Sequence, residues 1–180
     1  EETLLATIEE INADPAIHGC LLFRPLPPHL NTPAVVSVLK PEKDIDAITT
    51  ASMGGLLTKD GVGFAPCTAT ACLELLHYYE IPLKGKKIAM IGKSATVGLP
   101  TALLLMQEDA TVSVCHIFTD AEDTRRFCLD ADIIISLSHF KGHGMGGYGG
   151  ALKQLSIGCA SAWGKWNIHG GGDPIVGMKN

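Results

Sequence analysis

The segment Ile88–Pro100 places glycine, lysine and serine directly after a short apolar run, a combination suited to holding phosphate groups. Gly92-Lys93-Ser94 matches the end of a P-loop, but G-x-x-x-x-G-K-[ST] requires glycine where Lys87 stands. The G-x-G-x-x-G dinucleotide fingerprint also fails, because position 94 is serine. The segment predicts a strand, a glycine turn and a helix whose N-terminal N–H groups face a diphosphate. The alternative is a tight turn that binds nothing.

Other residues around this turn also have expected roles. Ser94 can add a hydroxyl donor, and Gly98 can let the helix approach the sheet closely. The next apolar run, 110–115, is followed by His116 and Ile117, at a strand end where an acid favours NAD and an arginine favours NADP. Neither type is present there, so the cofactor choice stays open. His116, by spacing alone, is a packing or capping residue.

Strands and helices alternate around these residues. The apolar pattern predicts three strands with two helices between them: strands 88–91, 110–115 and 133–137, and helices 96–107 and 120–129. This order is half of a doubly wound nucleotide-binding fold with parallel strands, so the predicted class is α/β. A helix at 68–80 precedes it, and the breaks at Pro82 and Gly85 place a domain boundary near Leu83.

The first sixty residues are predicted to be mixed in structure. Helices are expected at 3–11, 33–39 and 51–58, and Thr3 is the expected cap of the first one. A strand is expected at 17–23, ending where prolines follow. Residues 40–47 should form a polar loop with two aspartates.

Composition excludes several classes of protein. The chain has 180 residues, 46% hydrophobic and 18% charged, which fits one or two globular domains rather than a disordered chain. A net charge of -5 argues against a nucleic-acid surface, and no apolar stretch is long enough to span a membrane. The six cysteines lack C-x-x-C spacing and follow no recognisable signal peptide. We therefore expect free, buried thiols in a reducing cytosol.

The chain changes character near residue 137. Of the 20 glycines, 12 lie between Gly142 and Gly177, which predicts an irregular, glycine-rich tail. Four residues there are possible metal ligands, although a surface loop region without metal is the preferred interpretation: His139, His143, Cys159 and His169. The segments Ser138–His143, Gly147–Lys153, Gly158–Ser161 and Gly164–Lys165 resemble uncharacterised proteins that are often joined to ferredoxin-type iron–sulfur domains, over about residues 132–169. An iron–sulfur-associated or metal-binding protein is therefore one alternative.

Seven segments before the tail follow the order and spacing of one enzyme family: Asn12–Gly19, Arg24–Pro27, Pro41–Asp46, Pro66–Thr68, Leu83–Lys87, Ile91–Pro100 and Ala110–His116. Together they resemble the bifunctional methylenetetrahydrofolate dehydrogenase/methenyltetrahydrofolate cyclohydrolase family over residues 4–136. The resemblance implies a partial folate-binding catalytic domain at 1–83, a Rossmann-like NAD(P)-binding domain at 84–137, and a tail at 138–180 of different origin. The implied reaction is hydride transfer from the methylene carbon of the folate to nicotinamide, followed by hydrolysis of the methenyl ring.

The same resemblance implies the site residues. Asp46 would hold the pterin ring, because a carboxylate can accept two hydrogen bonds from an amino-pyrimidine edge, and Phe23 and Pro25 would line the substrate site. The implied cofactor-binding residues are Gly92, Lys93, Ser94, Val97, Gly98, Pro100, Cys67, Thr68, His116 and Ile117. The family's catalytic lysine and its partner tyrosine have no equivalent in residues 1–180, so weak or no cyclohydrolase activity is expected.

The implied cofactor is NADP, with NAD possible, and the implied partners are tetrahydrofolate derivatives, with no nucleic acid, membrane or metal. The family further implies a cytoplasmic enzyme of one-carbon metabolism and purine biosynthesis, and a homodimer when complete. A non-catalytic dinucleotide-binding fragment is the second alternative.

Overall fold

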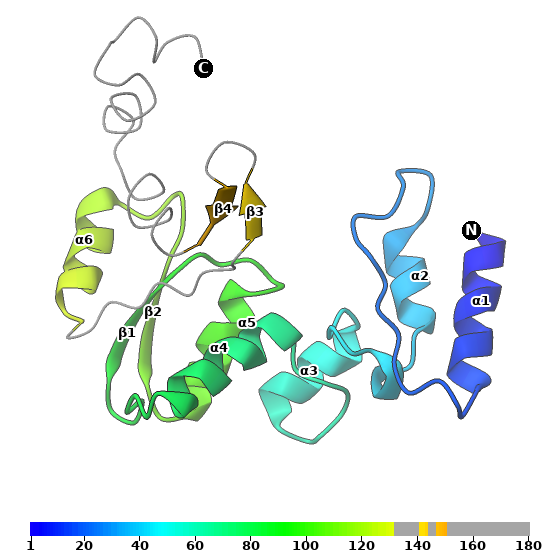
Figure 1. Cartoon of the computed structure of the whole chain (residues 1–180), viewed down its shortest axis with the longest axis horizontal. Coiled ribbons are helices and arrows are strands. Elements are labelled where there is room, and N and C mark those ends of the chain that lie inside the picture. Colours follow the sequence, from blue (N-terminus) through cyan, green and yellow to red (C-terminus); the bar gives the residue numbers. More distant parts are fainter. Residues whose placement is uncertain (132–140, 144–146, 151–180) are drawn as a thin grey trace, which may run out of the picture. The chain divides into compact units, whose positions relative to one another are not determined.

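The computed structural model describes residues 1–131, 141–143 and 147–150, and its contacts divide the chain into two compact units, Glu1–Asp132 and Ile133–Asn180. The elements of the first unit are α1 (Glu2–Ala13), α2 (Thr32–Val38), the 3-10 helix η1 (Pro41–Lys43), α3 (Thr50–Thr58), α4 (Cys67–Tyr78), β1 (Lys87–Ile91), α5 (Gly98–Gln107), β2 (Thr111–Cys115) and α6 (Ala121–Leu129) (Figure 1). None of the helices in the described ranges has the length and apolar character that crossing a bilayer requires.

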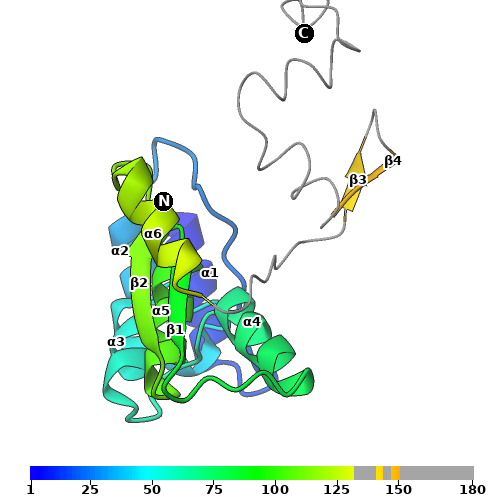
Figure 2. The ribbon, with the colours of Figure 1, turned by 90° about the vertical axis from the view of Figure 1, so that its left-hand side faces the viewer.

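β1 and β2 form a parallel pair, in register from Lys87 opposite Thr111 to Ile91 opposite Cys115. Helix α5 contacts both strands and α6 contacts β1, and the two helices lie on opposite sides of the pair (Figure 1; Figure 2). This strand–helix–strand–helix order confirms the predicted α/β class. The predicted strand at 133–137 lies outside the described residues.

The larger hydrophobic core joins α3, α4, α5 and the segments that lead into the two strands. Its buried members are Leu56, Ala69, Leu73, Leu76, Leu83, Leu104, Leu105 and Ala110. Three of them recur at helical spacing along α4, so they face the same side of that helix. Gln107 Nε2 donates to the Leu56 carbonyl over 2.6 Å, which links the end of α5 to α3. The domain limits near Leu83 stay a prediction.

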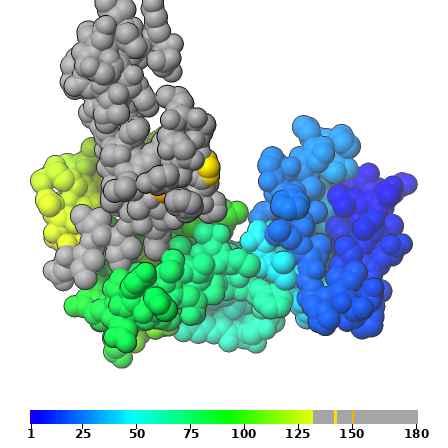
Figure 3. Space-filling view, viewed as in Figure 1, coloured from blue at the N-terminus to red at the C-terminus, as the bar shows by residue number. Residues whose placement is uncertain are grey.

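A smaller core lies between α1 and α2, where Ile8, Val35 and Leu39 are buried. Figure 3 shows the two helices, in dark and light blue, in direct contact. A hydrogen bond joins the C-terminal ends of the two helices: Asn12 Nδ2 donates to the Val38 carbonyl over 2.7 Å. The two helices therefore form one packed layer.

The lysine that ends η1 also satisfies the C-terminal end of α1. Lys43 Nζ donates to the carbonyl of Ile11 and, over 2.5 Å, to that of Asp14. A cation near the last carbonyls of a helix is favoured by the helix dipole. This contact fixes the chain immediately before Asp44.

Asp44 is a fully buried carboxylate that organises the chain before α3. Its exposed fraction is 0%, Oδ1 accepts from the Ile48 N–H over 2.9 Å, and Oδ2 accepts from the Thr49 N–H over 2.8 Å. Thr49 in turn caps α3, since its Oγ1 accepts from the Ser52 N–H over 3.1 Å. Burial alone would raise the pKa of Asp44, but these donors outweigh it and hold the pKa below its ordinary value.

Two expectations for the first unit were wrong. Thr3 does not cap α1: the helix begins at Glu2, and the Thr3 carbonyl accepts from Thr7 Oγ1 inside it. The strand expected at 17–23 is absent, since that segment forms only an isolated parallel bridge between Cys20 and Asp44. A strand needs a neighbouring strand to pair with it, and here the segment that faces Cys20 has η1 before Asp44 and a turn after it.

The second unit is not wholly irregular, which corrects the prediction for the tail. Its described residues form β3 (Lys141–His143) and β4 (Gly147–Gly149), paired antiparallel with Gly142 opposite Tyr148. An aromatic residue such as tyrosine favours a strand. His143 lies on β3, whereas the other possible metal ligands of the tail and the rest of its predictions lie outside the described residues.

The described cysteines are free, as expected, but only one is buried. Cys115 is 1% exposed, Cys67 is exposed, and Cys20, Cys72 and Cys128 are half-buried. Burial also raises the pKa of the Cys72 thiol. The expectation of buried thiols therefore holds for Cys115 alone.

Gly54 and Gly55 offer a matched test of the packing of α3. A Cβ on Gly55 would overlap the Val62 carbonyl oxygen, whereas a Cβ on Gly54 meets nothing within 4 Å. We expect Gly55→Ala to lower the free energy of unfolding by about 1–3 kcal/mol. Gly54→Ala should raise it by up to about 1 kcal/mol, because alanine favours a helix. Urea unfolding of both variants measures these free energies. Equal changes in the two variants would contradict the close contact between Gly55 and the Val62 carbonyl.

Asp44 should make stability depend on acid pH. Because its folded pKa lies below the unfolded value of about 3.9, its contribution is complete above that value and is lost as the pH falls through the folded pKa. We expect Asp44→Asn to be less stable at neutral pH and to lose less stability between about pH 5 and about pH 2. Thermal unfolding across this range measures both chains. If the melting temperatures of the two chains fall in parallel as the pH decreases, Asp44 is not the titrating group.

Candidate functional site

The turn after β1 carries a row of free N–H groups at the carboxyl end of the strand pair. Gly92 has a φ of 123°, and its own N–H donates to the Cys115 carbonyl at the end of β2 over 2.8 Å. The next four N–H groups, those of Lys93–Thr96, donate to no acceptor within the described residues. Free N–H groups that precede a helix form an arrangement suited to an anion.

Ser94 stabilises this turn by accepting hydrogen bonds from the residues that follow it. Its Oγ accepts from the N–H groups of Val97 and Gly98, each over 3.2 Å, and its carbonyl accepts from the Leu99 N–H over 3.0 Å. A hydroxyl that accepts still has its own hydrogen to donate. Ser94 can therefore support the first turn of α5 and also donate to a ligand.

The first residues of α5 lie close against the turn. A Cβ on Gly98 would overlap the Gly92 carbonyl oxygen, which is the close approach expected of Gly98. Pro100 is fully buried, and Val97 is half-buried directly before the helix. The side chains of residues 93–96, in contrast, are exposed.

The chain after β2 forms a turn that two hydrogen bonds of His116 hold together. The His116 N–H donates to Thr119 Oγ1 over 2.9 Å, and His116 Nδ1 accepts from the Phe118 N–H over 3.2 Å. His116 is thus a turn-capping residue here. Ile117 and Phe118 are 91% and 83% exposed, so this strand end presents two apolar side chains to solvent.

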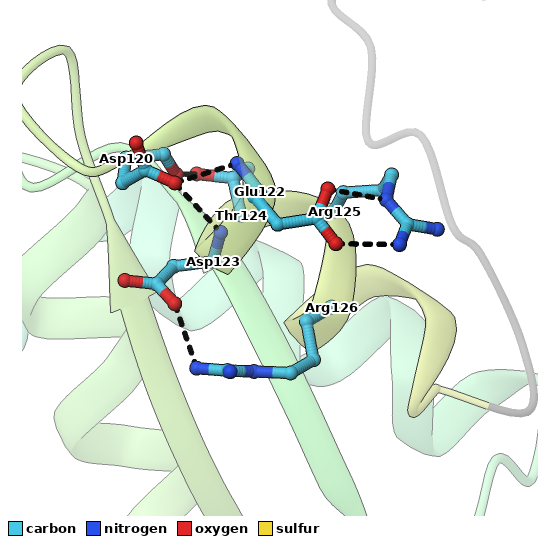
Figure 4. Close-up of polar contacts among 6 residues, drawn as sticks. All are labelled: Asp120, Glu122, Asp123, Thr124, Arg125 and Arg126. Carbon is cyan, nitrogen blue, oxygen red and sulfur yellow. Dashed lines mark hydrogen bonds and ion pairs between the residues drawn. The ribbon is translucent and has the colours of Figure 1, made fainter.

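Acidic residues dominate the beginning of α6. Asp120 caps the helix, since its Oδ1 accepts from the N–H groups of Glu122 and Asp123 over 2.8 and 3.3 Å (Figure 4). Arg125 donates to Glu122 over 2.5 and 2.8 Å, and Arg126 donates to Asp123 over 2.7 Å (Figure 4). Both guanidinium groups are therefore engaged by carboxylates of their own helix.

Lys93 differs from these arginines. It is exposed and forms no ion pair within the described residues. Its ammonium can approach a phosphate that rests on the adjacent N–H groups, although a lysine cannot make the bidentate contact of an arginine. Lys93 thus supplies a positive charge beside the turn after β1 that is not paired with a carboxylate of the described residues.

A second group of predicted residues gathers around Ile45. Cys67 Sγ donates to the Ile45 carbonyl over 2.9 Å, which brings the first turn of α4 beside Asp46. Asp46 is half-buried, and its carboxylate has no hydrogen bond or ion pair to the described residues. Thr68 is exposed next to Cys67. A free carboxylate, a thiol and a hydroxyl therefore occur on neighbouring segments.

Phe23 and Pro25 are less closely tied to Asp46. Phe23 is 82% exposed, and Pro25 is exposed after a cis peptide bond. The Cys20 N–H donates to the Lys43 carbonyl over 2.6 Å, which joins their segment to the loop of the two aspartates. The structure brings this segment to the loop and shows no contact of either side chain with Asp46.

Sequence reasoning assigned no role to Asp44, although it is the buried member of the aspartate pair. An aspartate followed by threonine and serine at the start of a predicted helix is a usable signal, because such residues bond to nearby N–H groups. No cluster of three or more His, Cys, Asp or Glu side chains suited to a metal occurs in the described ranges. One open hollow, beside α3, is lined in part by Gly55, Phe64 and Gln107, and it contains none of the predicted site residues.

Two family models match the chain. Residues 1–46 match the catalytic domain of tetrahydrofolate dehydrogenase/cyclohydrolase, and residues 66–139 match the NAD(P)-binding domain of the same family. Asp46 ends the first match, while Cys67, Lys93 and His116 lie in the second. The candidate residues of both groups thus fall inside the matched regions.

Named relatives agree with these matches. The bifunctional protein FolD of Carboxydothermus hydrogenoformans is 44% identical over 136 residues, which is 76% of this chain and 47% of the relative. FolD of Alkaliphilus metalliredigens is 42% identical over 135 residues, covering 75% and 47% respectively. The chain therefore spans about half the length of the curated relatives it matches.

Solved structures show the same likeness. FolD from Campylobacter jejuni has a TM-score of 0.63 and 40% identity, over 66% of this chain and 42% of that chain. The methylenetetrahydrofolate dehydrogenase-cyclohydrolase of Trypanosoma brucei, solved with NADP and an inhibitor, has a TM-score of 0.69 and 29% identity, over 83% and 59%. With both family models matched in order and these relatives alongside, the chain belongs to the tetrahydrofolate dehydrogenase/cyclohydrolase family.

Proposed function

We propose that this chain supplies the folate-binding and NAD(P)-binding parts of a methylenetetrahydrofolate dehydrogenase/methenyltetrahydrofolate cyclohydrolase of one-carbon metabolism. The observation that carries the proposal is the row of free N–H groups at Lys93–Thr96, placed between β1 and the N-terminus of α5. In α/β folds, ligands bind outside the carboxyl ends of the strands, and this row lies at such an end.

On the cofactor side, the N–H groups of the turn would hold the diphosphate, with Lys93 neutralising charge and Ser94 donating its hydroxyl. NADP is the proposed cofactor, in line with the NADP bound to the Trypanosoma brucei relative. NAD is possible, because Ile117 supplies neither an acid nor an arginine at the β2 end. When bound, the nicotinamide ring would accept a hydride from the methylene carbon of the folate.

On the substrate side, Asp46 would accept hydrogen bonds from the pterin edge of a tetrahydrofolate derivative, since its carboxylate is free within the described residues. Phe23 and Pro25 would contribute apolar surface to the same site. Cys67 and Thr68, held beside Ile45 by the thiol hydrogen bond, would form part of the wall of the cleft near the nicotinamide. The chain's own residues thus bind and orient the two reactants.

The finer assignments rest on family resemblance. We propose domain limits at 1–83 and 84–137, a cytoplasmic enzyme acting in purine biosynthesis, and a homodimer for the complete protein. The apolar side chains left exposed at several elements, among them Tyr78 and Ile117, are compatible with further protein contacts.

Ser94→Ala should weaken NADP binding. The substitution removes the acceptor of the Val97 and Gly98 N–H groups and one ligand donor, so the dissociation constant for NADP should rise about fivefold to tenfold. Isothermal titration calorimetry measures this. Ser37→Ala, which removes an exposed hydroxyl bonded to the Ala34 carbonyl, is the control and should leave binding unchanged. Unchanged binding in Ser94→Ala would contradict the phosphate turn.

Enzyme activity is tested by incubating the chain with methylenetetrahydrofolate and NADP or NAD and following reduced nicotinamide. We expect turnover, and Asp46→Asn should raise the KM for the folate about tenfold without changing the KM for NADP, because only the pterin contact is weakened. Glu42→Gln, an exposed neighbour, is the control. Binding of both ligands without turnover would instead favour the non-catalytic dinucleotide-binding role.

A further inference from the structure

Two aspartates of one short loop have opposite surroundings. Asp44 is fully buried, and both of its carboxylate oxygens accept main-chain hydrogen bonds. Asp46, two residues later, is half-buried, and its carboxylate has no partner within the described residues. One carboxylate is thus used inside the fold, and the other is left for a ligand.

The hydrogen bonds of Asp44 enclose Asp46. The N–H groups of Ile48 and Thr49, which precede α3, donate to the Asp44 carboxylate. These two bonds close a short loop that contains Asp46. Within it, Ala47 has a φ of 51°, is 5% exposed, and donates its N–H to the Asp44 carbonyl over 3.3 Å. The backbone on both sides of Asp46 is therefore fixed.

Hydrogen bonds from neighbouring segments also attach this loop to the rest of the unit. The Ile45 carbonyl accepts from Cys67 Sγ, and the Lys43 carbonyl accepts from the Cys20 N–H. The Lys43 ammonium is held at the end of α1. The loop is thus attached to α1, to the segment of Cys20 and to α4, while the Asp46 side chain has no bonding partner among the residues that the structure describes.

A simple helix-capping role does not account for Asp44. Thr49 already caps α3 through its bond to the Ser52 N–H, and the two N–H groups that Asp44 accepts lie outside the helix. A carboxylate suits this geometry, because both of its oxygens accept main-chain N–H groups whereas a neutral amide offers a single acceptor oxygen. The side chains of Ser52 and Thr49 also bond to Asp44. Loss of the bond from Thr49 would leave a buried N–H unpaired.

We propose that Asp44 is a positioning residue for the folate site: it closes the loop 44–49 so that the Asp46 carboxylate is presented to the pterin edge. The inference rests on the proposed function, since it takes Asp46 to be the pterin ligand. It adds a residue that acts through Asp46 without touching the folate itself.

Hydrogen exchange tests the local half of this inference in the absence of any ligand. In Asp44→Asn, the amides of residues 45–49 should exchange at least about tenfold faster, while those of β1 and β2 keep their protection. Asp60→Asn is the matched control, because Asp60 Oδ1 accepts the Val62 N–H over 3.0 Å in an exposed turn. Unchanged exchange at 45–49 would overturn the inference. Asp44→Ser, which keeps one acceptor on a smaller side chain, serves if Asp44→Asn does not fold.

A double-mutant cycle tests the functional half, with tetrahydrofolate as the probe and its dissociation constant as the readout. Asp44→Asn should weaken binding about tenfold, but less than about twofold in the Asp46→Asn background, because its effect passes through Asp46. Equal weakening in both backgrounds would mean a general structural role and would overturn the inference. Failure of the unsubstituted chain to bind tetrahydrofolate would overturn the proposed function, and hydrogen exchange would still decide whether Asp44 fixes the loop.

Discussion

The close contact between the start of α5 and the end of β1 is the constraint on which the cofactor side of the molecule depends. The Gly92 carbonyl lies where a side chain at position 98 would stand, so only glycine allows the helix to approach this closely. That approach places the Ser94 hydroxyl against the first N–H groups of the helix and leaves those of Lys93–Thr96 free. The surface proposed to bind an anion is therefore a product of backbone packing more than of particular side chains.

In the proposed folate site, one aspartate supports the loop and the other is available to a ligand. A buried carboxylate without donors would be costly, and Asp44 avoids that cost by accepting two N–H groups in a water-free position. Asp46 has no such partners within the described residues and keeps its capacity to accept. The same residue type thus has two different surroundings within three positions, and both burial and hydrogen bonding distinguish Asp44 from Asp46.

Much of the fold was predictable because its pattern is local. The alternation at β1, α5, β2 and α6 follows from apolar periodicity and from the turns between these elements. The segment around Cys20 was mispredicted as a strand, because strand formation depends on a neighbour that periodicity cannot reveal. The turn proposed to hold phosphate could be located in the sequence from Gly92 and Gly98. The spacing of Asp44, Thr49 and Ser52 is a signal for local N–H bonding, but the sequence does not reveal that Asp44 is completely buried.

The hydrogen bond from Gln107 to Leu56 has a mechanical consequence. Helix α5 begins at the phosphate turn and α3 begins at the aspartate loop, and this bond joins the last residue of α5 to the second half of α3. The buried side chains of Leu56, Leu104 and Leu105 pack in one core beside this bond. The two proposed binding regions are therefore joined through the packing of α3 and α5 as well as through the chain that connects them.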